Sequence, residues 1–538
     1  MKKFITTIAL AAMLTLATFL AANAASPDEG VLIPLRATFE DAGATASWQS
    51  YDRTIHIYVA DDTTIVLHTR YPRGYVNDRV IHLQDGITIM QDMAFITPGD
   101  LALLFSGGQP DNNIDFISTA RNLMDMFATG DINGMLQTMQ LDEISEMMLH
   151  AYAGVYQSLI LQRGSILNWE MVGYYEIEGG KLFHFDINHS IGQGGITIAI
   201  TNTGEFAGLQ ETEFTLTPIP PQEGAAYYAN PVVIGDQSPW ALDGILTMPH
   251  SASADAPVPA VVLVHGSGPG NKDSSVFDNR PFHDIASFLS SNGIAVLRYN
   301  KRTLTHGMAF MQAHYDSFTV WEETIEDAIL ASEILLTDPR VSRVYVLGLS
   351  LGGSLAPRIA EEAGLDGVIM LGAFARPAFE VSYDQNILSI SGAVASGLMS
   401  QEEADYYLIM VADLLAEAQT LSELTDEEMQ GREIFGLPAV YQRSIVDSLP
   451  IPIIMRNHIP TLILHGGRDW QVSQERDFQR FVEYVGKHEH VTTMLHEGIN
   501  HIFMQSMTEY NDLRDYAISG HVDAQVLAGI VEWINGNH

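Results

Sequence analysis

The sequence contains no cysteine and has few basic residues. Without cysteine it has no disulfide framework, no thiolate nucleophile and no cysteine lipid anchor. Its 538 residues include 27 Lys and Arg against 66 Asp and Glu, which gives a formal net charge of −39. Such a chain repels phosphate groups, which argues against nucleic acid and anionic membrane surfaces as partners. We interpret the excess acid as a solvated surface, because no motif has the spacing of a metal-binding site.

Long hydrophobic runs are also missing after residue 24, where no apolar stretch approaches the ~20 residues that span a bilayer. Before that point, Lys2 and Lys3 precede the stretch FITTIALAAMLTLATFLAA, and Ala22-Asn23-Ala24 fits a cleavage site. This pattern predicts a signal peptide at residues 1–24 and a secreted, extracellular protein without an integral membrane span. Attachment to the cell surface stays open. An uncleaved anchor is disfavoured, because the stretch ends in small residues and lacks a basic stop-transfer flank.

Residues 30–108 alternate apolar and polar positions, as in RTIHIYVA and TTIVLHT, which predicts short half-buried strands joined by turns. The text from IPLRATFEDAG to QDMAFITP resembles the copper amine oxidase-like N-terminal domain, a small stalk module of secreted bacterial proteins. The resemblance implies no copper chemistry, because the module is an appendage. His56, His68 and His82 lack ligand spacing. A contact of this domain with cell wall or another polymer stays open.

Residues 112–216 have a different texture. The stretch IDFISTARNLMDMFATG has helical apolar spacing and is followed by strand-like GITIAITNTGEF, which predicts a small α+β domain. It resembles the NTF2-like module often found ahead of secreted α/β hydrolases. We interpret its methionine-rich helix face as core packing. Residues 217–230 read as a linker stiffened by prolines.

From residue 231 to residue 538 the pattern becomes strand, helix, strand, helix. Continuous apolar strands separated by crossover helices predict a mostly parallel sheet that is covered on both faces. The strand-like runs are PAVVLVHG, GIAVLRYN, RVYVLG, GVIMLGAF and PTLILHGG. Residues 376–456 interrupt the alternation, and we expect them to form a helical cap. The predicted fold class is therefore a multidomain chain with a doubly wound α/β domain at its C-terminal end.

The stretch GLSLGG at residues 348–353 fits the pattern G-x-S-x-G, which is weak on its own in a chain with 44 glycines. Its context is stronger, because Ser350 falls between the strand-like RVYVLG and the helical LGGSLAPRIAEEAG. A sharp turn at this junction holds a serine in a strained conformation at the carboxyl edge of a sheet. Gly348 and Gly352 suit close helix–strand packing. Ser350 is the candidate nucleophile, and a simple flexible turn is the alternative.

A nucleophilic serine needs a base, and the base needs an orienting carboxylate. Asp469 in LILHGGRDW and His501 in LHEGINHIFM both follow strand-like runs, and the chain order Ser, Asp, His is typical of such sites. We predict a triad of Ser350, Asp469 and His501. Candidates that fit less well, because they lie within a strand, beside one or before a Gly-Gly turn, are His465, His496 and Glu497.

An oxyanion hole completes such a site, and it is commonly built from the amide after the nucleophile and one from an earlier strand-end loop. Here these are the backbone N–H groups of Leu351 and, in VHGSGPGNKD, of Ser267 or Gly268. A structural Gly-Pro loop is the alternative.

Together LDGILTMP, VHGSGPGNKD, VLGLSLGGSLAPRIA, LHGGRDWQVS and GINHIFM resemble a bacterial α/β-hydrolase family of esterases, over about 300 residues. Its relatives include acyl-CoA thioesterase-like and dienelactone hydrolase-like proteins and, more distantly, prolyl oligopeptidase-type peptidases. The resemblance implies Ser350 as nucleophile, Asp469 as acid and His501 as base. Two positions depart from the family: Leu349 stands where histidine is frequent, and Asn300 where aspartate is. Both bear on the pocket wall or a supporting hydrogen bond.

We therefore expect a secreted serine hydrolase that cleaves carboxylic esters through an acyl-enzyme, on a small-molecule or polymer-linked ester substrate. No metal or organic cofactor is needed for this chemistry. Two alternatives stay open. The same triad serves peptidases, thioesterases and acyltransferases. The Leu349 and Asn300 departures, together with two N-terminal modules, also fit an inert cell-surface binding protein.

Overall fold

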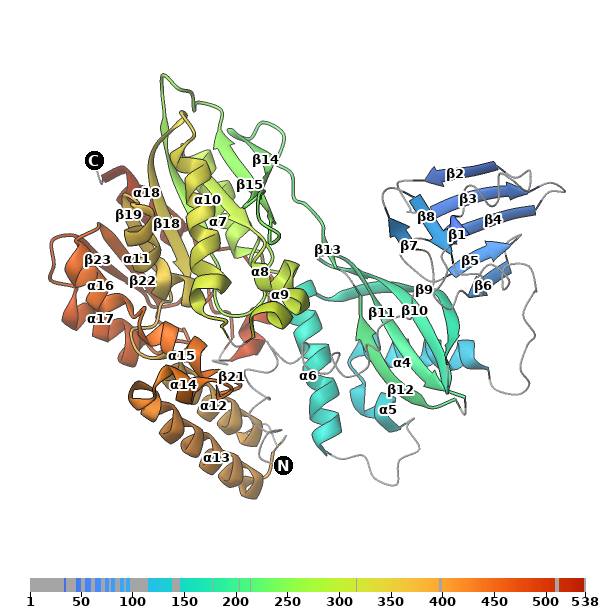
Figure 1. The fold of residues 1–538 in the computed structure, drawn as a ribbon. Coiled ribbons are helices and arrows are strands. Elements are labelled where there is room, and N and C mark those ends of the chain that lie inside the picture. The colour runs from blue at the N-terminus through green and yellow to red at the C-terminus, as the bar shows by residue number, and fades with distance from the viewer. Residues whose placement is uncertain are drawn as a thin grey trace. The chain divides into compact units, whose positions relative to one another are not determined.

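The computed structural model describes the strands between residues 33 and 96, residues 115–137, and residues 146–536 apart from positions 178, 203, 213, 316, 396–398 and 509–511. The chain divides into two compact units, one within residues 22–217 and one that contains residues 218–538 (Figure 1). In the described residues of the chain, no helix has the length and apolar character needed to cross a membrane.

The first strands of the chain form two antiparallel sheets, with orders β2-β3-β4-β5-β6 and β1-β8-β7. Their bounds are β1 (Ile33–Pro34), β2 (Thr45–Gln49), β3 (Thr54–Val59), β4 (Thr63–His68), β5 (Arg73–Val76), β6 (Arg79–His82), β7 (Thr88–Met90) and β8 (Met93–Ile96). Ile55 and Leu67 pair across β3 and β4, and both side chains are buried. The predicted short strands are therefore confirmed. The side chains of His56, His68 and His82 lie outside the described residues.

Helices precede a curved antiparallel sheet in the rest of this unit, as the sequence predicts. The helices are α4 (Phe116–Thr129), α5 (Ile132–Gln137) and α6 (Glu146–Arg163), and the sheet has β9 (Ile166–Ile177), β10 (Gly180–His189), β11 (Gly192–Thr201), β12 (Phe206–Glu211) and β13 (Thr215–Leu216). Phe183 and Phe185, two positions apart on β10, share one core with Phe127 of α4. Met124 and Met135 are buried in the same core, so the methionine-rich helix face is core packing.

The second unit is built on a sheet of order β14-β15-β17-β16-β18-β19-β22-β23. The strands are β14 (Tyr227–Ile234), β15 (Leu242–Pro249), β16 (Val258–Val264), β17 (Ala295–Tyr299), β18 (Val341–Leu349), β19 (Gly367–Leu371), β22 (Thr461–Gly466) and β23 (Val491–His496). From β17 to β23 all pairs are parallel, whereas β14 and β15 pair antiparallel. The predicted mostly parallel sheet is confirmed, and β14 begins at Tyr227, inside the predicted linker.

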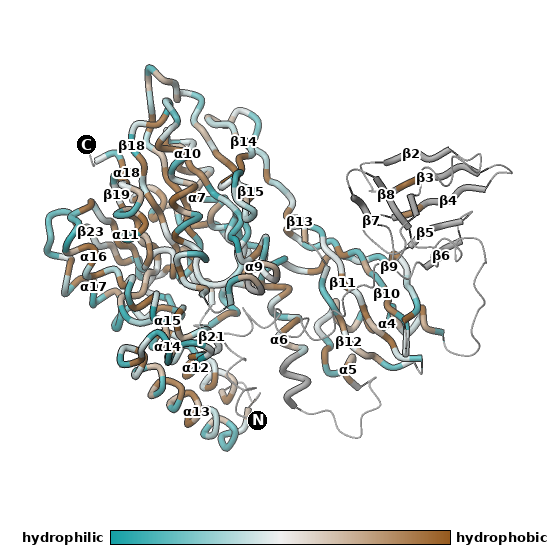
Figure 2. Tube along the Cα trace, in the orientation of Figure 1, coloured by the Kyte–Doolittle hydropathy of each residue, from teal (hydrophilic) through white to brown (hydrophobic). Residues whose placement is uncertain are grey.

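Helices cover both faces of this sheet, and this explains why inner strands such as β16 and β19 are continuously apolar (Figure 2). On β16, Val262 belongs to one core and Val261 to the other. The first face packs on α10 (Glu326–Leu336), α11 (Leu351–Ala363), α16 (Pro450–Asn457) and α17 (Gln479–Tyr484), and the second on α7 (Pro281–Ser291) and α18 (Ala524–Gly536). Shorter helical turns are α8 (Arg302–Thr305), α9 (Gly307–His314), η1 (Trp321–Ile325), η3 (Gln474–Phe478) and η4 (Leu513–Ala517).

A helical insertion separates β19 from β22 in the sequence, where the cap is predicted. It contains α12 (Ala378–Ala395), α13 (Gln401–Gln419), η2 (Thr420–Glu423), α14 (Asp426–Met429), β20 (Glu433–Ile434), β21 (Leu437–Pro438) and α15 (Ala439–Val446). Most of these elements share a core of their own, which includes Phe379, Leu421 and Phe435. The last helices of the insertion also reach the core beneath the sheet, which contains Tyr441 and Ile445 of α15 as well as Ile451 and Ile454 of α16. The end of the predicted cap range 376–456 therefore packs on the sheet.

Candidate active site

Ser350 lies on a strained turn between β18 and α11. Its φ is 57° and its ψ is −119°, a conformation that non-glycine residues rarely adopt. A Cβ at Gly348 would lie 2.1 Å from the Gly352 carbonyl oxygen, and one at Gly352 would lie 2.4 Å from the Val264 carbonyl oxygen. Only glycine fits at either position, because the turn, the helix and β16 meet at close range. The predicted strained junction at Ser350 is thus present.

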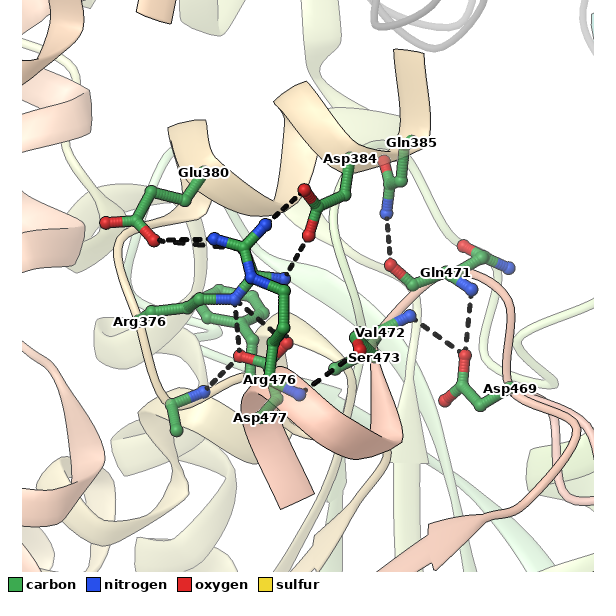
Figure 3. A network of polar contacts seen from close by, with 12 residues as sticks. Arg376, Glu380, Asp384, Gln385, Asp469, Gln471, Val472, Ser473, Arg476 and Asp477 are labelled. Atoms are coloured by element: carbon green, nitrogen blue, oxygen red, sulfur yellow. Dashed lines mark hydrogen bonds and ion pairs between the residues drawn. The ribbon is translucent and has the colours of Figure 1, made fainter. Parts of the chain in front are cut away.

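Asp469 and His501 lie next to each other at the same edge of the sheet as Ser350. Asp469 follows β22 and His501 follows β23, and both side chains are buried. His501 Nδ1 lies 2.7 Å from Asp469 Oδ2. The other carboxylate oxygen accepts the backbone N–H groups of Gln471 and Val472, each at 2.9 Å (Figure 3). Burial acts to raise the pKa of Asp469, but the charge and hydrogen bond of His501 and the backbone donor keep that pKa below its ordinary value.

The peptide between Leu371 and Gly372 joins these two parts of the site. Ser350 donates its backbone N–H to the Leu371 carbonyl oxygen at 2.8 Å. Gly372 has a φ of 56°, and a Cβ there would lie 3.0 Å from His501 Nδ1 and 3.3 Å from Asp469 Oδ2. The end of β19 therefore touches the serine turn on one side and the Asp–His pair on the other. Gly372 is not recognisable as a site residue in the sequence, because its only signal is a glycine directly after a buried strand.

The structure thus brings Asp469 and His501 together and places the turn of Ser350 beside the same Leu371–Gly372 peptide, but Ser350 and His501 share no hydrogen bond. Between these two described residues, no contact of the Ser350 hydroxyl with the imidazole is within hydrogen-bond range. In enzymes without substrate, such catalytic hydrogen bonds are often long and tighten only when substrate binds.

The weaker histidine candidate, His465, lies beside Asp469. Its Nε2 is 3.9 Å from Asp469 Oδ2 and 3.2 Å from the Val472 carbonyl oxygen, and its ring stacks on Phe478. Burial lowers its pKa. His465 thus lies within β22, whereas Asp469 lies in the turn that follows the strand.

The loop after β16 approaches Ser350, as expected for an oxyanion loop. A Cβ at Gly266 would lie 3.2 Å from the Ser350 Cβ. This places the peptide that carries the Ser267 N–H beside the nucleophile. Leu351 is the first residue of α11, so its N–H is free of the helix's own hydrogen bonds.

The contacts of Asn300 and Leu349, the two departures from the family pattern, show the structural role of each residue. Asn300 Oδ1 accepts the backbone N–H of Lys272 at 2.9 Å, which ties the loop after β16 to the end of β17. An amide oxygen serves this role as a carboxylate would, without its charge. Leu349 is 6% exposed and belongs to the same hydrophobic core as Leu371 and Phe503. It is thus a core residue.

A buried cluster of charges anchors the cap close to Asp469. Arg376 lies between β19 and α12 and pairs with Asp477 at 2.9 Å and with Asp384 at 2.6 Å (Figure 3). Asp477 also accepts the backbone N–H of Ala375. Burial acts to lower the pKa of Arg376, but the two carboxylates raise it, so the guanidinium stays charged.

A second bond connects the cap to the turn that carries Asp469. Gln385 of α12 donates its side-chain amide to the carbonyl oxygen of Gln471 at 2.9 Å. Gln471 in turn donates its backbone N–H to Asp469 (Figure 3). Helix α12, the first helix of the cap, is therefore bonded to the turn that carries Asp469.

Among the residues that the structure describes, no group of three or more His, Cys, Asp or Glu side chains is placed to hold a metal ion.

Comparison with known sequences identifies two regions. The sequence model of the copper amine oxidase N-terminal domain matches residues 17–102, which confirms the resemblance of this region to that domain. The model of the α/β hydrolase family matches residues 261–513, which include Ser267, Ser350, Asp469 and His501.

Among solved structures, Est1E from Butyrivibrio proteoclasticus is 16% identical with a TM-score of 0.35, over 57% of this chain and 98% of Est1E. The acylaminoacyl peptidase of Pyrococcus horikoshii is 12% identical with a TM-score of 0.37, over 69% of this chain and 56% of the peptidase. Likenesses this low carry no argument about function.

A curated relative is much more similar. The esterase EstD of Thermotoga maritima is 32% identical over 397 residues, which cover 72% of this chain and 88% of EstD. The chain therefore belongs to the α/β hydrolase family and is a carboxylesterase-like hydrolase.

Proposed function

We propose that the protein is a secreted serine carboxylesterase that forms an acyl-enzyme on Ser350, with His501 as base and Asp469 as acid. The observation that carries the proposal is the 2.7 Å bond from His501 Nδ1 to Asp469 Oδ2, beside the strained turn of Ser350. Gly372 packs against this pair, while the preceding carbonyl holds the backbone of Ser350.

The reaction follows from these positions. His501 Nε2 takes the proton of the Ser350 hydroxyl as its oxygen attacks the ester carbonyl carbon. Asp469 keeps the imidazole proton on Nδ1 and stabilises the imidazolium. The N–H groups of Leu351 and Ser267 hold the tetrahedral oxyanion. Collapse expels the alcohol, which receives its proton from His501, and an activated water then releases the acid.

Active-site labelling tests the nucleophile. We expect a fluorophosphonate probe to label the wild type, and Ser350→Ala to abolish labelling and lower kcat by about 10⁴-fold or more. Ser291→Ala, at an exposed serine near the end of α7, is the matched control and should retain both. Labelling that survives in Ser350→Ala would remove Ser350 from the mechanism. Absence of labelling in folded wild type would favour the inert binding protein.

The preferred acyl group is tested by a substrate panel. The relation to EstD favours esters. We therefore expect kcat/KM to be higher on p-nitrophenyl esters, tested over a range of acyl chain lengths, than on thioesters or peptides. Thioesters of the same acyl groups test the acyl-CoA thioesterase-like alternative, and blocked peptides test the peptidase alternative. An acceptor alcohol that diverts product from acid to new ester would indicate an acyltransferase.

Export and the N-terminal domains form a separate part of the proposal. We propose that residues 1–24 are cleaved and that residues 112–216 form an NTF2-like domain, which the helices α4 to α6 ahead of the β9–β12 sheet support. N-terminal sequencing of protein from the culture medium should begin at Ala25. Retention of the intact Lys2–Ala24 segment in the cell pellet would indicate the anchor instead.

A further inference from the structure

Lys301 is a buried lysine bonded to the loop that would hold the oxyanion. It lies after β17 and is 2% exposed. Its Nζ donates to the Gly266 carbonyl oxygen at 2.8 Å, and its backbone N–H donates to the Gly270 carbonyl oxygen at 2.8 Å. One residue thus fixes both ends of the segment from Gly266 to Gly270, which contains Ser267.

A carboxylate and a phenol hold the ammonium group in place. Lys301 Nζ lies 2.7 Å from Glu323 Oε1, on the π-helical turn η1, and Glu323 is also buried. Glu323 Oε2 accepts the Tyr441 hydroxyl at 2.5 Å. Burial and the Glu323 charge raise the pKa of Tyr441 well above its ordinary value, so the phenol remains a donor. Tyr441 belongs to α15, so this chain of bonds begins in the cap.

The geometry of the peptide group links Lys301 to catalysis. A peptide is planar and trans, so the C=O of Gly266 and the N–H of Ser267 point in opposite directions. Fixing the carbonyl on Lys301 therefore aims the N–H away from the lysine. A cation on the carbonyl oxygen also draws electron density from the amide, which strengthens its N–H as a donor. Gly266 lies against Ser350, so this peptide is beside the nucleophile.

We infer that Lys301 is a positioning residue of the esterase reaction, which orients and polarises the Gly266–Ser267 peptide so that its N–H stabilises the oxyanion. This rests on the proposed serine mechanism. Lys301 itself touches neither substrate nor the reacting atoms. Its effect therefore belongs to the transition state, in which the charge on the carbonyl oxygen develops, and much less to substrate binding.

The test compares two buried ion pairs whose basic residues, Lys301 and Arg302, are adjacent in the sequence. Lys301→Met combined with Glu323→Gln removes both charges at once, so no lone charge stays buried. The matched control is Arg302→Met with Asp327→Asn. Arg302 and Asp327 form an equally buried pair, with Arg302 Nε 3.1 Å from Asp327 Oδ2. The described contacts of Arg302 include none to the oxyanion loop.

We expect the Lys301 double variant to lose about 10- to 100-fold in kcat on a short p-nitrophenyl ester, with KM changed by less than about 3-fold. A trifluoromethyl ketone, whose adduct with serine carries an oxyanion, should bind weaker by the same factor as kcat/KM falls. The Arg302 control should keep kcat within about 3-fold. Lys301→Arg, which keeps the charge, should recover part of the loss.

Equal losses of kcat in both double variants, or an unchanged affinity for the ketone, would overturn the inference. If the Lys301 double variant does not fold, Tyr441→Phe decides, because it loosens Glu323 and should lower kcat several-fold at constant KM. An unchanged kcat there also overturns the inference. The wild type and Ser350→Ala are run in parallel. Ketone inhibition that does not depend on Ser350 would instead contradict the proposed function.

Discussion

Gly372 is the residue at which backbone conformation and catalysis meet most directly. Its φ of 56° lies in the left-handed region, and its missing side chain leaves room for the His501 ring. Any Cβ at this position must displace either the imidazole or the strand end that holds Ser350. The site thus depends on a residue with no chemistry of its own.

Gly372→Ala should therefore lower kcat by about 10-fold, because the added Cβ shifts the imidazole by a fraction of an ångström and a displacement of about 1 Å costs on the order of 10²-fold. It should also cost about 1 kcal/mol of unfolding free energy for the strained backbone. Ester hydrolysis kinetics and urea unfolding measure the two effects.

Gly364→Ala is the control for strain alone. Gly364 follows α11 with a φ of 65°, and a Cβ there would meet no atom within 4 Å. It should cost a similar stability and leave kcat unchanged. Equal kcat in the two variants would show that the contact of position 372 with His501 is unimportant.

At this scale the sequence predicted the residues that we propose to carry the chemistry, but not those that support them. Ser350, Asp469 and His501 are recognisable because each follows a buried strand and their order matches a known mechanism. Gly372 and Lys301 act through contacts with segments far away in the chain. Such contacts arise only when β19 is inserted between β18 and β22, and β16 between β17 and β18.

At the scale of elements, the cap is held to the sheet by charge as well as by packing. Arg376 and Asp477 are both buried, and they join the start of the cap to η3. A buried charge that loses its partner keeps its desolvation penalty, and therefore single substitutions at such pairs are costly.

Asp477→Asn should reduce the free energy of unfolding by about 3 kcal/mol, since it removes the fully buried partner and leaves the guanidinium with Asp384 at 2.6 Å and Glu380 at 3.8 Å. Glu361→Gln, which removes the exposed pair with Arg456, should cost less than about 1 kcal/mol. Urea unfolding at pH 7 compares them. Similar small losses for both would contradict an anchoring role for Asp477.

The elements themselves differ in how far the sequence predicts them. The parallel strands were predictable because burial on both faces leaves continuous apolar runs, such as Val258–Val264. Strand β14 contains Asn230 and Pro231 on the exposed edge of the sheet, so its composition resembles a linker. The packing of α15 and α16 on the sheet was not predictable, since a helical pattern does not reveal which core the helix joins.

At the scale of the whole molecule, each of the two compact units buries a neutral histidine. Burial lowers the pKa of His265, in the unit of residues 218–538, to about 4. Burial likewise lowers the pKa of His189, in the unit of residues 22–217, to about 4. In the unfolded chain the pKa of histidine is about 6.5.

Both units should therefore lose stability as the pH falls from about 6.5 to about 4. In this window the unfolded chain binds more protons than the folded one, so protonation favours unfolding, by up to about 3 kcal/mol per histidine. Because each unit has its own core, we expect two calorimetric transitions. His265→Gln should make the transition of its unit less sensitive to pH, and His189→Gln the other.

The exposed Ser291 supplies the control for this experiment. Because a serine side chain does not change its charge in this window, Ser291→Ala should leave the pH dependence of both transitions unchanged. A wild type whose two transitions do not shift between pH 7 and pH 5 would contradict the buried neutral histidines.

The π-helical turn Trp321–Ile325 has a consequence for insertions and deletions in related chains. A π turn accommodates one residue more than an α-helix of the same span, and each residue of an α-helix advances about 100° around the axis. Deleting one residue between Trp321 and Ile325 would rotate Glu323 away from Lys301 without altering any catalytic side chain. The length of this turn therefore affects the oxyanion loop through Glu323 and Lys301. We expect related chains with a shorter turn to carry another residue in place of Lys301.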